Sequence, residues 1–258
     1  MDTLRVSVPT DTRAPGGETN AYVVGRDPAL LIDPAGRTDR LDDAVADRNV
    51  AHVAVTHAHP DHVDGVAEYA AAQDATVWAR AGRTERFRAA IGVAPDETFR
   101  EGTTVPTGDG PVPVLDVPGH APDHVAFVAG GDILVGDCAV AEGSVVVADP
   151  EGDMRGYCTA LRRLHALAPE RLLPGHGPAI DDPRATCRRL LAHRLDRERR
   201  VERAVRDGAR AVDAVLDAAY DKDLAGVRDL AAATVRAHLA KLAVESRVRW
   251  DGTDAKPP

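Results

Sequence analysis

The segment 55-VTHAHPDHVDG-65 places three of the chain's 10 histidines within six positions and adds an aspartate between them. His57 and His59 are two residues apart, so on an extended turn their side chains point to the same side and can share one metal ion. Asp61 and His62 follow a proline that stiffens the turn, and we expect them at the start of a helix, converging on a second ion. Imidazoles and carboxylates are ligands for zinc, iron and manganese. The segment therefore predicts a metal site.

Further ligands are expected where other strands end. Three residues share that position, each closing an apolar run within a turn that contains glycine: His120, Asp137 and His176. Glycine lets the backbone approach a metal closely. Seven ligands are enough for two ions. The expected arrangement is His57, His59 and His120 on one ion, Asp61, His62 and His176 on the other, and Asp137 as the bridge.

The elements that position these ligands follow from short apolar runs separated by turns. Runs rich in β-branched residues predict strands at 4–8, 21–25, 29–33, 51–56, 75–79, 112–117, 124–129, 132–137 and 170–175. Helical stretches are predicted at 38–48, 61–73 and 154–167. Because strands and helices interleave without a strict βαβ rhythm, the sequence predicts a layered α/β fold with mixed sheets.

The amino-acid composition of the chain changes after about residue 183. Ten arginines and four acidic residues lie between 184 and 210, in a chain whose formal net charge is -9. The pattern at 235–250 is that of a helix followed by a strand, as in the last helix and wing of a winged-helix domain. We therefore predict a catalytic domain at 1–183, a helical, winged-helix-like domain with a basic linker helix at 184–252, and a disordered tail at 253–258.

The composition of the chain restricts the cellular compartment and the partners that we expect. The acidic balance argues against a protein that coats nucleic acids non-specifically. The three cysteines show no CxxC spacing and cannot all pair, so we expect no disulfide. Neither a signal peptide nor an apolar run of about 18 residues is visible, so we expect a cytoplasmic protein with no membrane partner. The sequence leaves the oligomeric state open.

The motifs THAHPDH, PGH, GD and PGHG, in this order and spacing, resemble the metallo-β-lactamase superfamily, which implies an αββα sandwich. The stretches 138–164, 193–199 and 236–242 resemble its lactamase-beta-2 subgroup, which carries a small C-terminal winged-helix-like domain. The resemblance extends from about residue 18 to 249. It implies that Asp33 supports a ligand imidazole from behind the metal site. It also implies Asp61 and Asp137 as catalytic residues.

The family's mechanism uses two divalent ions, for which zinc is expected first and iron or manganese second. The ions lower the pKa of a bridging water, and the hydroxide attacks a carbonyl or phosphorus centre. Because characterised relatives in the subgroup cleave RNA, and an arginine-rich helix suits a phosphate backbone, we expect cleavage of single-stranded RNA. The acidic catalytic domain and the lack of an aromatic stacking platform argue against that substrate.

Two other functions remain open. A thioester hydrolase of the hydroxyacylglutathione hydrolase type shares the same ligand set and acts on an anionic small molecule. A non-enzymatic alternative is nucleic-acid or partner binding through the C-terminal domain. β-Lactam hydrolysis is disfavoured, since many lactamases have cysteine where this chain has an aspartate. The candidate substrate contacts are His193, Tyr157, Arg197 and Arg200. Packing, or a solvated salt-bridged helix face, is the structural alternative for them.

Overall fold

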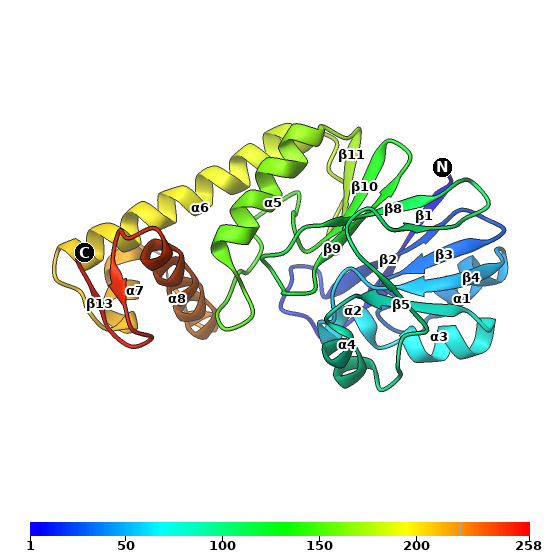
Figure 1. The fold of residues 1–258 in the computed structure, drawn as a ribbon, viewed down its shortest axis with the longest axis horizontal. Helices are drawn as coiled ribbons and strands as arrows, with labels where there is room; N and C mark the ends of the chain where they lie inside the picture. Colours follow the sequence, from blue (N-terminus) through cyan, green and yellow to red (C-terminus); the bar gives the residue numbers. More distant parts are fainter. Residues whose placement is uncertain (222) are drawn as a thin grey trace. The chain divides into compact units, whose positions relative to one another are not determined.

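A computed structural model describes residues 1–221 and 223–258 (Figure 1). The described chain forms two compact units. Unit 1 contains Met1–Val117, Asp123–Gly143 and Ala168–Pro183, and unit 2 contains Pro118–Pro122, Ser144–Leu167 and Arg184–Pro258. The predicted domain boundary at residue 183 coincides with the boundary between the last segment of unit 1 and the last segment of unit 2. The predicted first domain, however, also included residues 118–122 and 144–167, which the structure groups with unit 2 because helix α5 (Met154–Leu167) packs against helix α8 (Arg228–Val244).

The first sheet of unit 1 has six strands in chain order. They are β1 (Thr3–Pro9), β2 (Glu18–Val24), β3 (Ala29–Ile32), β4 (Val50–Ala54), β5 (Thr76–Arg80) and β6 (Glu97–Phe99). The pairs β1–β2 and β2–β3 are antiparallel, and the remaining pairs are parallel. Four helices belong to this part of the chain: α1 (Asp39–Ala46), α2 (Pro60–Val63), α3 (Val66–Gln73) and α4 (Thr84–Ile91). The sheet is therefore mixed, as predicted.

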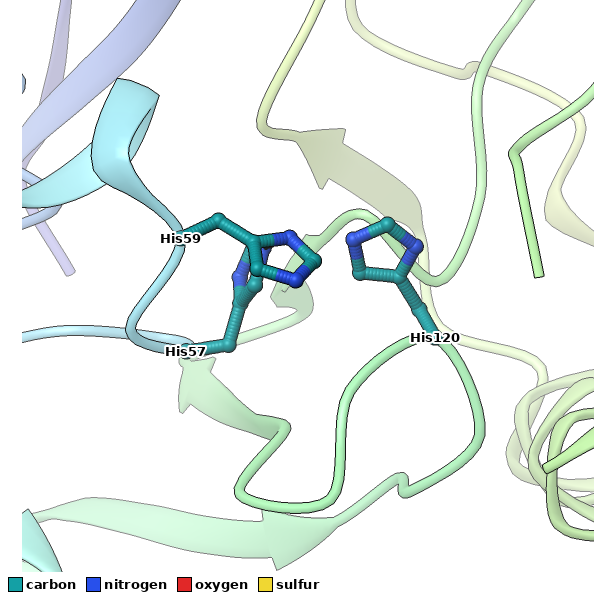
Figure 2. Close-up of side chains that lie close together, drawn as sticks. All are labelled: His57, His59 and His120. Atoms are coloured by element: carbon teal, nitrogen blue, oxygen red, sulfur yellow. Dashed lines mark hydrogen bonds between the residues drawn. The ribbon is translucent and has the colours of Figure 1, made fainter. Parts of the chain in front are cut away.

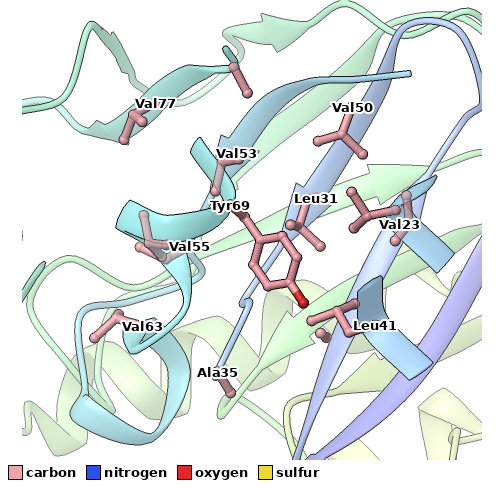
Figure 3. Close-up of a cluster of buried hydrophobic side chains, with 14 of the residues drawn as sticks. Val23, Leu31, Ala35, Leu41, Val50, Val53, Val55, Val63, Tyr69 and Val77 are labelled. Atoms are coloured by element: carbon pink, nitrogen blue, oxygen red, sulfur yellow. The ribbon is translucent and has the colours of Figure 1, made fainter. Parts of the chain in front are cut away.

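The helices pack on one face of this sheet. Leu31 of β3 and Val53 of β4 lie in one buried cluster with Leu41 of α1 and Tyr69 of α3 (Figure 3). The Tyr69 hydroxyl donates to Asp42 at 2.7 Å, so the buried ring also joins α3 to α1. Alternate residues of a strand point to opposite faces, which leaves the other face of the sheet for a second core.

The second sheet of unit 1 supplies that core. Its strands are β7 (Thr104–Val105), β8 (Val112–Asp116), β9 (Val125–Ala129), β10 (Asp132–Gly136) and β11 (Arg171–Pro174), in the spatial order β11-β10-β9-β8-β7. Leu30 and Ile32 of the first sheet share a buried cluster with Phe127 and Leu134 of the second. The predicted layered α/β fold is confirmed. Helix α4 and strands β6 and β7 were not predicted from the sequence.

The predicted helix at 61–73 is two helices. Residue Gly65 separates α2 from α3, and its backbone N–H donates to the carbonyl of Pro34 at 2.8 Å. A Cβ at this position would lie 2.8 Å from the same carbonyl oxygen, so only glycine allows this close approach. The break leaves α2 as a single short turn that carries Asp61 and His62.

Unit 2 is mainly helical. Besides α5 and α8 it contains α6 (Pro183–Arg206, yellow in Figure 1), α7 (Val212–Ala219), and the paired strands β12 (Arg249–Trp250) and β13 (Ala255–Lys256). The predicted disordered tail at 253–258 is wrong. Ala255 is fully buried, and its N–H donates to the carbonyl of Arg210 at 2.9 Å, so one apolar residue in a polar segment anchors the strand. The winged-helix assignment stays a prediction.

Two compositional expectations can be compared with the structure. Cys138, Cys158 and Cys187 are all free and buried. Across residues 1–221 and 223–258, no helix is both long and apolar enough to cross a lipid bilayer.

Buried ion pairs join the helices of unit 2. Glu198 of α6 is 3 % exposed and accepts from Lys241 of α8 at 2.6 Å and from Arg247 at 2.8 Å. Arg247 also pairs with Glu202, the next buried acid along α6. Burial raises the pKa of Glu198, but the neighbouring His238, whose Nδ1 lies 3.9 Å away, and the hydrogen-bonded Lys241 ammonium outweigh it and hold the pKa at about 2. The ionised carboxylate therefore stabilises the packing of α6 and α8.

Replacing this carboxylate gives a testable prediction. We expect Glu198→Gln to lower the free energy of unfolding of unit 2 by about 3 kcal/mol near neutral pH, because Lys241 keeps a buried charge with one partner fewer. The folded-state pKa lies below the ordinary 4.5, so this contribution is complete above pH 4.5 and is lost as the pH falls towards 2.

Urea unfolding followed by circular dichroism at several pH values measures both effects. Asp196→Asn on the exposed face of the same helix is the matched control and should change stability much less. Equal losses for the two variants, or a difference that does not shrink in acid, would contradict the role given to Glu198.

Candidate metal centre

The parallel neighbours β3 and β4 end at the same edge of the first sheet, which brings the residues after each strand together. Asp33 follows β3 and has a left-handed backbone with φ 51°. Its carboxylate accepts from the Thr56 backbone N–H at 2.6 Å and from the Thr56 hydroxyl at 2.8 Å. Thr56 immediately precedes His57, so these two bonds set where the histidine-rich turn begins.

The same carboxylate orients a histidine of helix α2. One Asp33 oxygen lies 3.1 Å from Nδ1 of the fully buried His62. A proton on Nδ1 makes this hydrogen bond and leaves Nε2 as the ligand nitrogen. Burial lowers the pKa of His62, but Asp33 and then Asp137 outweigh burial and raise it to about 9. Asp33 therefore lies where the predicted supporting role requires it.

His57 and His59 face each other across the turn. Nδ1 of His57 lies 3.0 Å from the Thr56 hydroxyl, and its Nε2 lies 2.9 Å from Nδ1 of His59. Two ring nitrogens this close need a proton or a cation between them, since each otherwise presents a lone pair. The backbone N–H of Ala58 donates to the buried carboxylate of Asp123 at 2.9 Å, which holds the turn in place.

The seven predicted ligands fall into three overlapping groups, within each of which the ligand atoms all lie within 4.8 Å of one another. The groups are His57, His59 and His120; His57, His62 and Asp137; and Asp61, His62 and His176. The rings of the first group face one another in Figure 2. Because His57 and His62 each belong to two groups, the seven residues form one continuous set of donors able to bind metal ions.

Buried nitrogens without partners show that these residues fit a metal. Nε2 of His62 and Nε2 of His176 are buried and have no hydrogen-bond partner among the described residues. They lie 3.6 Å and 3.4 Å from the same carboxylate oxygen of Asp137. The other nitrogen of the His176 ring donates to the Glu18 carbonyl at 2.8 Å, which aims the ring. Orphaned imidazole nitrogens around one carboxylate are costly without a cation.

Three further residues support the site: Asp123 and Thr56, which the sequence did not indicate, and His124, for which the sequence favoured a structural or supporting role over contact with substrate. Asp123 also accepts from Arg86 at 3.0 Å, and Nε2 of His124 accepts from the Asp137 backbone N–H at 3.1 Å. Thr56 connects Asp33 to His57 as described above. Each of the three lies next to a turn or a candidate ligand in the sequence. No other feature of the sequence indicates a role in the site. Their partners lie far away in the sequence and come from the paired strands.

The four predicted substrate contacts all belong to unit 2. His193 is exposed on α6. Arg197 donates to the Ala219 carbonyl at 2.6 Å, and its guanidinium lies 3.4 Å from the centre of the Tyr220 ring. The other two residues are Arg200, which pairs with Asp196 at 3.1 Å and with Asp221, and the fully buried Tyr157. Contact with a substrate remains a prediction for all four.

The fold and the ligand set together define a class of protein. The sequence profile of the metallo-beta-lactamase superfamily matches residues 14–176, which contain all seven predicted ligands. The chain therefore belongs to this superfamily, whose αββα fold generally serves metal-dependent hydrolases.

Individual relatives extend the likeness beyond the profile. A beta-lactamase-like protein 2 homolog of Drosophila melanogaster is 27% identical over 251 residues, covering 90% of this chain and 84% of the relative. A hydroxyacylglutathione hydrolase of Methylococcus capsulatus is 32% identical over 203 residues, covering 72% of this chain and 77% of the relative. The crystal structure of a metallo-beta-lactamase family protein of Thermus thermophilus superposes with a TM-score of 0.80 at 21% identity, covering 99% and 98% of the two chains.

The shape of the ligand set gives a prediction at Gly175. A Cβ here would lie 2.7 Å from Oδ1 of Asp137 and 2.7 Å from Cε1 of His62. We expect Gly175→Ala to displace these side chains and to weaken metal binding about 10- to 100-fold, as misaligned ligands do. Chelator-competition titration measures the affinities.

Gly36→Ala is the matched control, because its Cβ would meet only Val8 at an ordinary 3.6 Å. Unfolding curves for both variants check that the fold is kept. Unchanged affinities in a folded Gly175→Ala protein would contradict the proposed placement of the ions.

Proposed function

We propose that this chain is a dinuclear metal-dependent hydrolase that cleaves thioesters. The observation that carries the proposal is the environment of Asp137, whose Oδ1 faces the partnerless Nε2 atoms of His62 and His176. Asp137 also groups with His57 and His62 as a possible ligand set. A carboxylate that lies close to donors of both proposed ions would be able to bridge them.

The residues divide between two ions. His57, His59 and His120 would hold one, Asp61, His62 and His176 would hold the other, and Asp137 would serve both. Two divalent ions held in this way supply a Lewis acid for a carbonyl oxygen and lower the pKa of water to near neutrality. The donor set of imidazoles and carboxylates suits zinc, iron and manganese.

The chain's own residues prepare the site before substrate arrives. Asp33 holds the proton on Nδ1 of His62, and the Glu18 carbonyl holds the proton on Nδ1 of His176. Both Nε2 atoms are thereby directed at Asp137. Because Asp33 and Asp137 raise the pKa of His62 above its ordinary value, a cation at Nε2 competes with a proton, and metal binding should weaken as the pH falls.

A thioester is favoured over RNA for two reasons. First, the relative 32% identical to this chain is a hydroxyacylglutathione hydrolase, and a fungal relative, 28% identical, is named as a thioesterase. Second, the arginines expected to follow a phosphate backbone are engaged within unit 2. Arg197 is stacked on Tyr220, and Arg200 is paired with Asp196 and Asp221. A guanidinium held by a carboxylate binds phosphate only after giving up that partner.

Single-stranded RNA remains the second candidate, and one feature of α6 supports it. Three arginines and three aspartates line a cavity of about 480 Å³: Arg199, Arg200, Arg203, Asp196, Asp207 and Asp221. Such a surface accommodates a phosphate if the ion pairs rearrange. The non-enzymatic alternative, binding of nucleic acid or a partner through the C-terminal region, would use the same surface without hydrolysis.

A paired assay separates these functions. We expect the metal-loaded protein to hydrolyse S-lactoylglutathione and to leave labelled single-stranded RNA uncut. Asp61→Ala should lower the thioester kcat/KM at least about 100-fold, because it removes a ligand of one ion. Replacing Arg199, Arg200 and Arg203 together with Ser should leave the thioester rate unchanged.

RNA cleavage that depends on Asp61, with a KM raised by the arginine replacements, would instead establish the RNA function. Binding of RNA without hydrolysis of either substrate would support the binding module. RNA cleavage that survives Asp61→Ala would indicate a contaminating nuclease.

A further inference from the structure

The loop that carries His120 is seated on the first turn of helix α5. The backbone N–H of Asp153 donates to the Gly119 carbonyl at 2.8 Å. Gly119 has φ +141°, and a Cβ there would overlap the backbone nitrogen of Tyr157. Glycine is thus required twice, by the backbone conformation and by the close approach. The position of His120 therefore depends on the position of α5.

A second contact sets the direction of the His120 ring. Its Nδ1 lies 2.7 Å from the carbonyl oxygen of Val146, so Nδ1 carries the proton and Nε2 is left as the ligand nitrogen. The neighbours Val145 and Val147 are 6% and 0% exposed and anchor this segment. The ring of His120 is thus directed by a carbonyl in an irregular segment, which needs support of its own.

Arg194 provides that support. It lies on α6, is 3% exposed, and its Nη2 donates to the Val145 carbonyl, one residue before the carbonyl that receives the His120 proton. The same guanidinium lies 5.5 Å from the centre of the buried Tyr157 ring on α5. One buried cation thus contacts both structures that hold His120: the 145–147 segment and helix α5.

The burial of this charge calls for an explanation. A buried guanidinium is costly unless its donors are paired, and Nε of Arg194 has no hydrogen-bond partner in the described part of the chain. A methionine or leucine would fill the space without that cost. A single hydrogen bond to a main-chain carbonyl and an aromatic face offset it only in part. Arg194 is better explained by what it positions than by what it contributes to stability.

We propose that Arg194 is a positioning residue for His120, acting through the Val145–Val146 backbone and the Tyr157 ring. The inference rests on the proposed dinuclear function, since it concerns one ligand of one ion. Without the guanidinium, the Val146 carbonyl is no longer held towards Nδ1, and Nε2 loses its fixed direction. The ion held by His57, His59 and His120 then binds more weakly. The ion held by Asp61, His62 and His176 keeps its own supports, Asp33 and the Glu18 carbonyl.

The test compares the two metal affinities of the full-length chain. Arg194→Met keeps the volume but removes the donor and the charge, and Arg194→Lys keeps a charge and a donor. Arg188→Met, at an exposed position of the same helix, is the matched control. Zinc titration of the metal-free proteins against a chromophoric chelator gives a dissociation constant for each ion.

We expect Arg194→Met to lower the affinity for one of the two ions by about 10- to 100-fold and to leave the affinity for the other unchanged. Arg194→Lys should fall between Arg194→Met and the unmodified chain, and Arg188→Met should match the unmodified chain. If Arg194→Met proves to be unfolded by circular dichroism, Arg194→Lys and Gly119→Ala decide. Both should show the same selective loss, since Gly119→Ala displaces the His120 loop directly.

Unchanged affinities, or equal weakening of both ions in folded variants, would overturn the role of Arg194. Failure of the underlying function has a different signature: the unmodified chain itself would bind fewer than two ions. Selective loss in Gly119→Ala but not in either Arg194 variant would show that α5 alone seats the loop, and would also overturn the inference.

Discussion

The hydrogen bonds of the buried Asp33 carboxylate hold the candidate metal ligands in position. Asp33 lies at the end of β3 in a left-handed conformation and accepts from the backbone and hydroxyl of Thr56, while its second oxygen faces Nδ1 of His62. The hydrogen bond between this carboxylate and Nδ1 keeps a proton of His62 on the side away from Asp137. One residue thus connects the end of β3 to the start of the histidine-rich turn and to helix α2.

The remaining ligands follow the same scheme with different supports. A main-chain carbonyl accepts from Nδ1 of His176 and another from Nδ1 of His120, and each leaves Nε2 for a cation. A glycine that packs against a candidate ligand leaves space for its side chain. Gly175 does so for Asp137, since a Cβ at Gly175 would lie 2.7 Å from Oδ1 of Asp137. The site is therefore a set of strand-end side chains, each aimed by a partner on its far side, and the partners matter as much as the ligands.

The clustering of the seven candidate ligands could be predicted from the sequence because their residue types and motifs are local, whereas the residues that support them could not. Asp33 was inferred through the family resemblance. Asp123 and Arg194 were missed because they act on main-chain groups of residues 65 and 49 positions away, and main-chain groups leave no mark in a sequence pattern. The strands were predicted from apolar alternation, but the 61–73 helix broke at Gly65, where the close approach of Pro34 is a tertiary contact.

The contacts of the basic helix α6 could also be predicted from the sequence only in part. Pairs such as Asp196 and Arg200, four residues apart, can be read from the sequence. The stacking of Arg197 on Tyr220 and the burial of Glu198 against Lys241 cannot, because they depend on α6 meeting residues near or beyond the end of α7. Charge composition alone therefore gives the net charge of the helix but not which of its arginines are already paired within the protein.

The number of metal ions bound per chain decides whether the site is dinuclear. Plasma mass spectrometry on the protein purified without chelators, and again after reloading with zinc, iron or manganese, should give two ions per chain for the unmodified sequence. The Asp137→Ala variant should bind less than one ion tightly, because it lacks the carboxylate that is proposed to bridge the two ions. One ion or none in the unmodified, fully reloaded protein, with all seven ligands intact, would contradict the dinuclear site.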